Sequence, residues 1–178
     1  MEVPDQRLTA ATFADLALPL FDQLYNFARW LTQDATEAED LVQETYVKAL
    51  RGFSGFQPGT NFRAWIFRIL RNAFLNSRAG LKIMALDPDD EEPASDAPSP
   101  EAVLVAQANR DSVRAALTEL ALPQREILLL CEVEEMSYEE IAQVLAIPIG
   151  TVMSRLHRAR KALRAVLLGK SQGASHGL

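Results

Sequence analysis

The sequence contains few of the residues that build covalent or metal-held sites. Its 178 residues include one cysteine and two histidines. A single cysteine cannot form an intramolecular disulfide, and Cys131, His157 and His176 are too few for a metal cluster. Cys131 lies in the apolar stretch 127–133, where a small core residue is expected. We therefore expect neither a structural metal nor a cofactor.

Long apolar stretches are also missing. The sequence has no run of about 18 or more apolar residues, which a transmembrane helix needs. Glu2 and Asp5, close to the N-terminus, do not fit the basic start of a secretory signal peptide. An apolar fraction of 48% is ordinary for a globular protein. These features predict a cytoplasmic protein with no membrane insertion.

Acidic residues are missing from two segments of the chain. The overall net charge is −6, yet residues 51–86 and 141–178 contain bases and no acids, whereas 87–101 contains acids and no bases. Basic segments attract the phosphates of nucleic acid. The alternation predicts two separate nucleic-acid contacts, with the acidic surfaces left for another partner.

The second basic segment begins with a pattern of two short helices joined by a turn. Ser137 and Glu140 have the spacing of a capping box, in which each side chain accepts the other residue's backbone N–H. Pro148 interrupts the pattern because proline has no N–H and disfavours helix in the residue before it. Thr151 can cap the second helix. The segment therefore predicts a helix-turn-helix, whose second helix would enter the DNA major groove.

The second of these helices has one apolar and one polar face. The apolar stripe consists of Val152, Leu156, Ala159 and Leu163. The polar face contains Ser154, His157, Arg158 and Lys161. A solvated basic face on an ordinary surface helix is the alternative interpretation. The absence of acids after residue 141 favours DNA binding, because solvated faces usually mix charges of both signs.

The first half of the chain predicts three helices. One apolar stripe at helical spacing consists of Leu16, Leu20, Leu24, Phe27 and Leu31. A second helix, over 36–50 and capped by Asp34 or Thr36, is expected to bury Ala38, Leu41, Val42, Thr45 and Ala49. Its exposed face is acidic and contains Glu37, Glu39, Asp40, Gln43, Glu44 and Lys48.

A loop at 52–61 separates the second helix from a third at about 62–78. Phe53 and Phe56 in this loop either pack on the core or wall a pocket for a base. The third helix is expected to bury Phe62, Ile66, Ile69, Leu70 and Ala73. Its other face contains Arg68, Arg71, Asn72 and Leu75, with Arg78 at the edge. Cations beside an amide suit DNA, since cations bind phosphate and amides bind base edges.

Composition changes sharply after the third helix. Residues 85–98 are acidic and rich in proline, alanine and serine, which predicts a flexible linker. Ser99 and Pro100 suit the start of a further helix, and Pro123 the start of another. The tail 169–178 is predicted to be disordered. The expected fold is all-α, with two small helical domains joined by a flexible acidic linker.

Four stretches, in this order, resemble bacterial RNA polymerase sigma subunits of the extracytoplasmic-function (ECF) group in the sigma-70 family. They are residues 34–50, 62–76, 122–130 and 137–163. The resemblance implies a sigma region 2 at 10–80, a linker at 81–100, a region 4 at 101–168 and a tail at 169–178. It implies a protein that binds core RNA polymerase, promoter DNA and an anti-sigma factor. Neither catalysis nor a small-molecule substrate is expected.

The resemblance also implies site residues. The expected contacts with core polymerase are Asp40, Gln43, Glu44 and Lys48. Those with the −10 element are Phe56, Asn61, Arg63, Arg68, Arg71, Asn72, Asn76 and Arg78. Those with the −35 element are Thr151, Ser154, Arg155, His157, Arg158 and Lys161. Ala64 and Trp65 stand where primary sigma subunits have two tryptophans, which implies weaker intrinsic melting, and Trp65 is expected to pack. Met153 stands where many members have Arg or Lys.

Two other functions remain open from the sequence. A dimeric helix-turn-helix repressor would explain residues 137–168 but leave the first domain without a role. A sigma-like module that only titrates an anti-sigma protein would not touch DNA, and such a module has no need of two basic faces.

Overall fold

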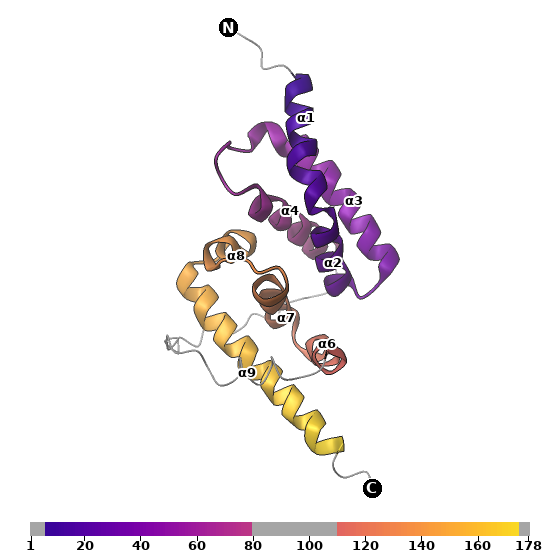
Figure 1. The fold of residues 1–178 in the computed structure, drawn as a ribbon, viewed down its shortest axis with the longest axis vertical. Helices are drawn as coiled ribbons and strands as arrows, with labels where there is room; N and C mark the ends of the chain where they lie inside the picture. Colours follow the sequence, from indigo (N-terminus) through magenta and orange to yellow (C-terminus); the bar gives the residue numbers. More distant parts are fainter. Residues whose placement is uncertain (1–5, 80–109, 175–178) are drawn as a thin grey trace. The chain divides into compact units, whose positions relative to one another are not determined.

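Every regular element in the described part of the chain is a helix (Figure 1). The computed structural model describes residues 6–79 and 110–174, with side chains at 12–79 and 110–169. The all-α prediction is therefore confirmed over these residues, which form two compact units. None of their helices has both the length and the apolar character needed to cross a membrane. The predicted linker at 85–98 and the predicted helix start at Ser99 lie outside the described residues.

Among the residues that the structure describes, the first unit contains four α-helices and two short 3-10 turns. They are α1 (Gln6–Ala17), η1 (Leu18–Leu20), α2 (Phe21–Thr32), α3 (Ala35–Gly52), η2 (Phe53–Gly55) and α4 (Phe62–Ser77). Helix α3 packs against both α2 and α4. Phe27 of α2 and Phe67 of α4 are fully buried, with ring centroids 5.5 Å apart. The core of this unit therefore lies where α2, α3 and α4 meet.

The apolar stripe predicted across residues 16–31 is interrupted. Leu24, Phe27 and Leu31 are buried in α2, as expected, but Leu16 is 39% exposed. Pro19 is the second residue of the 3-10 turn η1, which lies between α1 and α2. A 3-10 turn winds more tightly than an α-helix, so residues before it no longer lie in line with those after it. The predicted stripe is therefore correct only for α2.

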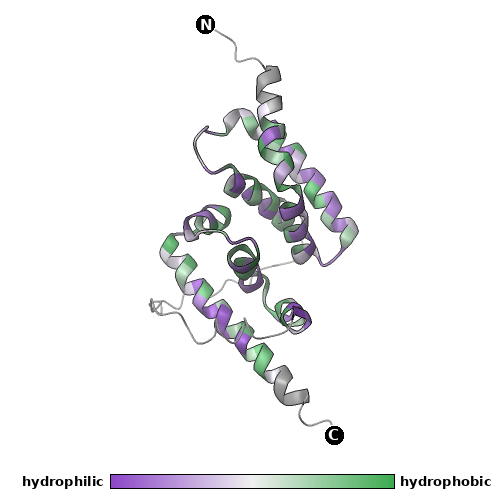
Figure 2. Cartoon of the chain, viewed as in Figure 1, coloured by the Kyte–Doolittle hydropathy of each residue, from purple (hydrophilic) through white to green (hydrophobic). Residues whose placement is uncertain are grey.

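Helix α3 agrees with its prediction. The Asp34 side chain caps it by accepting the N–H of Glu37 at 2.8 Å, immediately after Gln33 ends α2 in a left-handed conformation. The buried residues are those predicted, namely Ala38, Leu41, Val42, Thr45 and Ala49. The acidic residues of the opposite face are exposed. Figure 2 shows hydrophilic and hydrophobic residues alternating along this helix.

Helix α4 buries more aromatic surface than predicted. Asn61 caps it by accepting the N–H of Ala64 at 2.9 Å. Phe67 and Phe74 are buried although the sequence pattern did not predict them, whereas Ile69 is only half-buried. The helix packs against both α2 and α3, so its apolar face is wider than one stripe.

The second unit contains the helix-turn-helix. Its elements are α6 (Arg110–Glu119), α7 (Leu122–Leu128), the π-helical turn η3 (Leu129–Val133), α8 (Tyr138–Leu145) and α9 (Ile149–Ala174). The predicted capping box is confirmed, because the Ser137 N–H donates to Glu140 at 2.8 Å and the Glu140 N–H donates to the Ser137 hydroxyl at 3.2 Å. The predicted stripe of α9 is buried, with Val152, Leu156, Ala159 and Leu163 at 2% exposure or less.

Two predictions for α9 are wrong. Thr151 does not cap the helix, because α9 begins at Ile149 and the N–H groups of Thr151 and Val152 both donate to the Pro148 carbonyl. A proline suits this position, since it has no N–H to leave unsatisfied. The helix also continues to Ala174, so the predicted disorder is wrong for residues 169–174. Extending a formed helix adds one hydrogen bond per residue without a new nucleation cost.

We expect Phe67→Ala to lower the free energy of unfolding of the first unit by about 3–5 kcal/mol, because the ring is fully buried. Urea unfolding should be followed by tryptophan fluorescence, since Trp30 and Trp65 both lie in this unit. Arg68→Ala, an exposed neighbour, should change stability by no more than about 0.5 kcal/mol. A loss below about 1 kcal/mol for Phe67→Ala would contradict this packing.

Candidate nucleic-acid and partner interfaces

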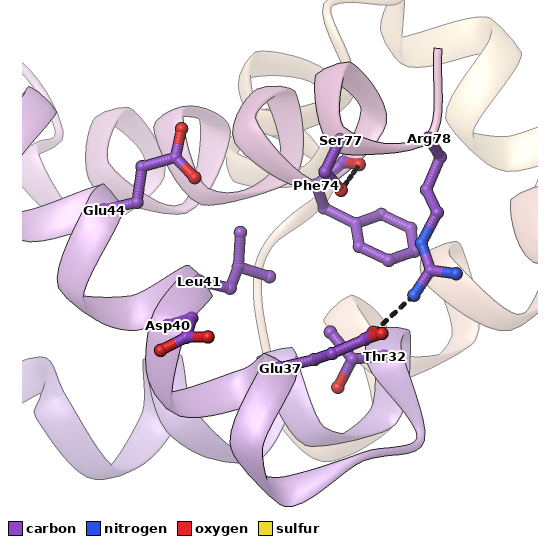
Figure 3. Close-up of a pocket in the computed structure, with 8 residues that line it drawn as sticks. All are labelled: Thr32, Glu37, Asp40, Leu41, Glu44, Phe74, Ser77 and Arg78. Atoms are coloured by element: carbon purple, nitrogen blue, oxygen red, sulfur yellow. Dashed lines mark hydrogen bonds and ion pairs between the residues drawn. The ribbon is translucent and has the colours of Figure 1, made fainter. Parts of the chain in front are cut away.

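An open cavity of about 330 Å³ lies between the acidic face of α3 and the C-terminal end of α4 (Figure 3). Its lining residues are Thr32, Glu37, Asp40, Leu41, Glu44, Phe74, Ser77 and Arg78. The three carboxylates are spaced three and four residues apart along α3, which places them on one face of the helix. A cavity lined in this way can accept a cationic or hydrogen-bond-donating group from a partner.

The three carboxylates of the cavity differ in their partners. Glu44 pairs with Lys48 on the next turn of α3, with 2.7 Å between nitrogen and oxygen. Glu37 pairs with Arg78 of the α4 terminus at 2.6 Å. Asp40 makes no ion pair or hydrogen bond with the described residues. Asp40 is therefore the carboxylate most open to a cation from another molecule.

The residues predicted to contact core polymerase lie together on α3. Asp40, Gln43, Glu44 and Lys48 are all exposed. Glu37 lines the same cavity but was missing from the predicted set. Its signal in the sequence was its position three residues before Asp40, which puts both side chains on one face of the helix.

The exposed face of α4 combines a cation with two amides. Arg68, Asn72 and Asn76 are all exposed, and they follow one another at intervals of four residues. This spacing aligns them along one side of the helix. Arg71 is half-buried beside them. The stripe has the donors and acceptors that phosphates and base edges require.

Several predicted −10 residues have structural partners in the first unit. The Arg63 Nε donates to Gln23 at 3.0 Å, and its guanidinium lies 5.8 Å from the Phe67 ring centroid. Asn61 caps α4, as described above. Arg78 pairs with Glu37 and lies 5.2 Å from the Phe74 ring centroid. In the described state these side chains stabilise the fold, and any contact with DNA would have to use their remaining donors.

The aromatic residues of the 52–61 loop pack on the core, which is one of the two interpretations that the sequence left open. The Phe53 ring lies 5.3 Å from Phe13, and the Phe56 ring lies 5.1 Å from Trp65 and 5.4 Å from Phe62. Trp65 packs within this cluster, as expected. Phe53, Phe56 and Trp65 are half-buried, so part of each ring surface faces solvent.

The polar side of α9 opposes its buried stripe. Lys161 is exposed, whereas the other predicted −35 residues are half-buried, namely Thr151, Ser154, Arg155, His157 and Arg158. The Ser154 hydroxyl donates to the Thr151 carbonyl at 3.1 Å. Ser154, Arg158 and Lys161 occupy successive turns at intervals of four and three residues, which forms one continuous edge. A helix with such an edge suits a major groove.

Arg160 differs from the other cations of α9. Its Nε and Nη2 both donate to Glu132, at 3.1 and 2.6 Å, and its Nη2 lies 3.6 Å from the Cys131 sulfur. Cys131 is half-buried, so the prediction of a core position was only partly correct. Burial raises the pKa of this thiol and the Glu132 charge raises it further, while Arg160 opposes both. A reactive cysteine needs the opposite shift.

Sequence comparison assigns both units to known regions. Residues 19–82 match the family profile described as Sigma-70 region 2. Residues 110–163 match the profile described as Sigma-70, region 4. The two matches follow the order predicted for the chain.

Individual relatives show the same relationship. The chain is 38% identical over 169 residues to the ECF RNA polymerase sigma factor SigE of Mycolicibacterium smegmatis, covering 88% of this chain and 65% of that protein. It is 37% identical over 153 residues to the ECF RNA polymerase sigma factor EcfG of Rhodopseudomonas palustris, covering 86% of this chain and 83% of the relative. Among solved structures, the complex of sigma factor RpoE with anti-sigma factor NepR from Bartonella quintana is similar, with 32% identity and a TM-score of 0.66. That match covers 88% of this chain and 96% of the other.

We expect alkylation of Cys131 by iodoacetamide to require a higher pH in the folded protein than in urea. Because the folded pKa is raised, less thiolate is present between the ordinary and the raised pKa. Glu132→Gln should lower the pH of half-maximal rate, since the Glu132 charge raises the pKa, whereas Glu139→Gln should not. A folded half-maximal pH at or below the unfolded one would contradict the described surroundings of the thiol.

Proposed function

The chain belongs to the ECF group of RNA polymerase sigma factors in the sigma-70 family, and we propose that its two units divide the work of such a factor. The first unit, region 2 over about 10–80, docks on core polymerase and binds the −10 element. The second, region 4 over about 101–168, reads the −35 element. The observation that carries this proposal is the order of two matched sigma regions, each with a polar face opposite a buried stripe.

The proposed polymerase contact is the exposed face of α3, with Asp40, Gln43, Glu44 and Lys48 at its centre. Its support is the cavity with three carboxylates, of which Asp40 is unpaired among the described residues. Exposed charges at an interface guide association and select the partner. A partner surface with basic side chains would complement this face.

The proposed −10 contact is the exposed stripe of α4, with Arg68, Asn72 and Asn76. The half-buried rings of Phe56 and Trp65 lie near the N-terminal end of the same helix. The exposed part of an aromatic ring can stack its face against an unpaired base, whereas the arginine and asparagines suit phosphates and base edges. Both features favour single-stranded or partly melted DNA as the ligand of this unit.

The proposed −35 contact is the edge of α9 formed by Ser154, Arg158 and Lys161. Arg158 is the residue proposed to read a base, because a half-buried guanidinium is held in place and can bind guanine through two hydrogen bonds. Lys161 is proposed to bind phosphate, since an exposed ammonium on a flexible stem provides charge without a fixed geometry.

An anti-sigma factor is a further proposed partner. The RpoE structure from Bartonella quintana is a complex with the anti-sigma factor NepR, and CnrH, a structural match with a TM-score of 0.61 and 28% identity, was solved with the cytosolic domain of CnrY. A protein that acts with RNA polymerase works in the cytoplasm, which is where we place this chain. Sigma factors are not a family of catalysts, and we propose no reaction for this one.

The two other functions are less well supported. A helix-turn-helix repressor needs no region 2, yet this region matches over residues 19–82. A module that only titrates an anti-sigma factor needs no continuous basic edge on α9. The polar stripes of α4 and α9 therefore favour a protein that contacts DNA with both units.

Charge reversal at the docking face should prevent polymerase binding. We expect Asp40→Lys with Glu44→Lys to lower affinity for core polymerase by at least about a hundredfold, since like charges facing each other at an interface cost several kcal/mol. Glu39→Lys on the same exposed helix is the matched control and should bind normally. Affinity can be measured by fluorescence anisotropy with labelled protein. Full run-off transcription by the double variant would show that the docking face lies elsewhere.

The two cations of α9 should differ in what they control. Arg158→Ala should change the preferred −35 sequence at one base pair, at a cost of about 1–3 kcal/mol. Lys161→Ala should weaken binding to all sequences alike and reduce the salt slope by about 0.9. Selection from randomised −35 sequences by reconstituted holoenzyme measures both effects. An unchanged preference with Arg158→Ala would exclude the base-reading role.

A further inference from the structure

We propose that the ion pair between Glu37 and Arg78 links the polymerase-docking face to the DNA-binding helix α4. In the free protein Glu37 holds and neutralises Arg78. When core polymerase occupies the cavity of Figure 3, a basic group of the polymerase takes over Glu37 and leaves Arg78 available to a DNA phosphate. This inference rests on the proposed function, because it assumes both the α3 docking face and a DNA contact near the end of α4.

The pair lies at the junction of the two surfaces. Glu37 is in the first turn of α3, and Arg78 is the residue that caps the C-terminal end of α4. The Arg78 Nη2 donates to Glu37 at 2.6 Å, and Figure 3 shows the guanidinium beside the Phe74 ring. The two residues are 41 positions apart in sequence, so the contact directly ties the two helices together.

The cavity beside the pair is lined by carboxylates that could bind a cation from a partner. Glu37, Asp40 and Glu44 all line it, and Arg78 is the only cation among the described residues that line it. Asp40 has no partner among the described residues. A cation that binds Asp40 from a partner therefore enters the cavity beside Glu37 and competes with Arg78 for the Glu37 carboxylate.

The exposure of the pair suits an exchangeable contact. The Glu37 side chain is 56% exposed and the Arg78 side chain 28%, so water and salt weaken their attraction. The pair between Arg160 and Glu132 is about equally exposed, at 26% and 51%, but it has more contacts, because two nitrogens of Arg160 bind Glu132 and one also contacts Cys131. The cavity beside Arg160 has no carboxylate other than the paired Glu132 among the described residues that line it. We regard the Arg160 contact as structural and the Arg78 contact as exchangeable.

The expected effect on DNA binding follows from charge. An arginine paired with a carboxylate gains less by binding phosphate, because it must first give up its partner. Glu37→Gln should therefore raise the affinity of the free protein for DNA by about two- to five-fold and steepen its salt slope by about 0.9. In the holoenzyme the pair is already open, so the same substitution should change neither quantity.

The test measures binding to a labelled, mixed-sequence DNA forked at one end, over a range of salt concentrations. Free protein and purified holoenzyme are compared for the unchanged chain, Glu37→Gln, Arg78→Gln and the double variant. Glu39→Gln is the matched control. It removes the same charge two residues further along α3 and leaves the pair between Glu37 and Arg78 intact. Circular dichroism and urea unfolding confirm that each variant folds.

Three results together support the proposal. Glu37→Gln strengthens DNA binding by the free protein, this gain disappears in the Arg78→Gln background, and Arg78→Gln lowers the salt slope of the holoenzyme only. A gain that persists without Arg78, or that Glu39→Gln reproduces, would be a general charge effect and would overturn the proposal. Weaker DNA binding with Glu37→Gln would also overturn it, because Glu37 would then be positioning Arg78 for DNA.

Comparing the free protein with the purified holoenzyme also separates a failure of this inference from a failure of the proposed function. If the unchanged chain assembles with core polymerase and supports transcription but Glu37→Gln has no effect on free-protein binding, only the link between the two surfaces fails. If the unchanged chain does not assemble with core polymerase, the proposed function itself fails.

Discussion

The burial of one stripe of α3 between α2 and α4 is the constraint on which the first unit depends. Both neighbouring helices pack against α3, and Leu41 and Val42 lie in the interior. A helix with one buried stripe must present its opposite side to solvent, and here that side has the carboxylates. Asp34 caps the helix and so sets where it begins. The core packing thus fixes the position of the proposed docking face.

The second unit also buries one stripe of a helix and exposes the opposite side, but here the exposed side has cations instead of carboxylates. The α9 stripe is buried against α6 and α7, which leaves Ser154, Arg158 and Lys161 along one solvent-facing edge. Arg160 lies on the flank and is bound by Glu132, so it joins helices instead of extending the basic edge. Both units therefore have an apolar interior and a polar exterior, and the proposed contacts with polymerase and DNA lie on these exteriors.

Features that depend on neighbouring residues in the chain could be predicted from the sequence. The Ser137 capping box and the buried stripe of α3 are of this kind, because short-range spacing determines them. Features that depend on packing between distant segments could not. Phe67 is buried because α2 lies across it, and Arg78 meets Glu37 only when α3 and α4 come together. The same limit explains why Arg78 was expected to be simply a DNA contact and why Glu37 was missing from the predicted docking face.

We propose that the two units act together as a promoter-directing subunit of RNA polymerase. Run-off transcription with core RNA polymerase and fragmented genomic DNA tests it most directly. We expect core polymerase with this chain to produce discrete transcripts from a limited set of start sites, and core polymerase alone to produce none of them. Absence of new discrete transcripts, despite a folded chain and active core polymerase, would contradict the account. Lowered transcription from promoters used by another sigma factor would instead indicate a repressor.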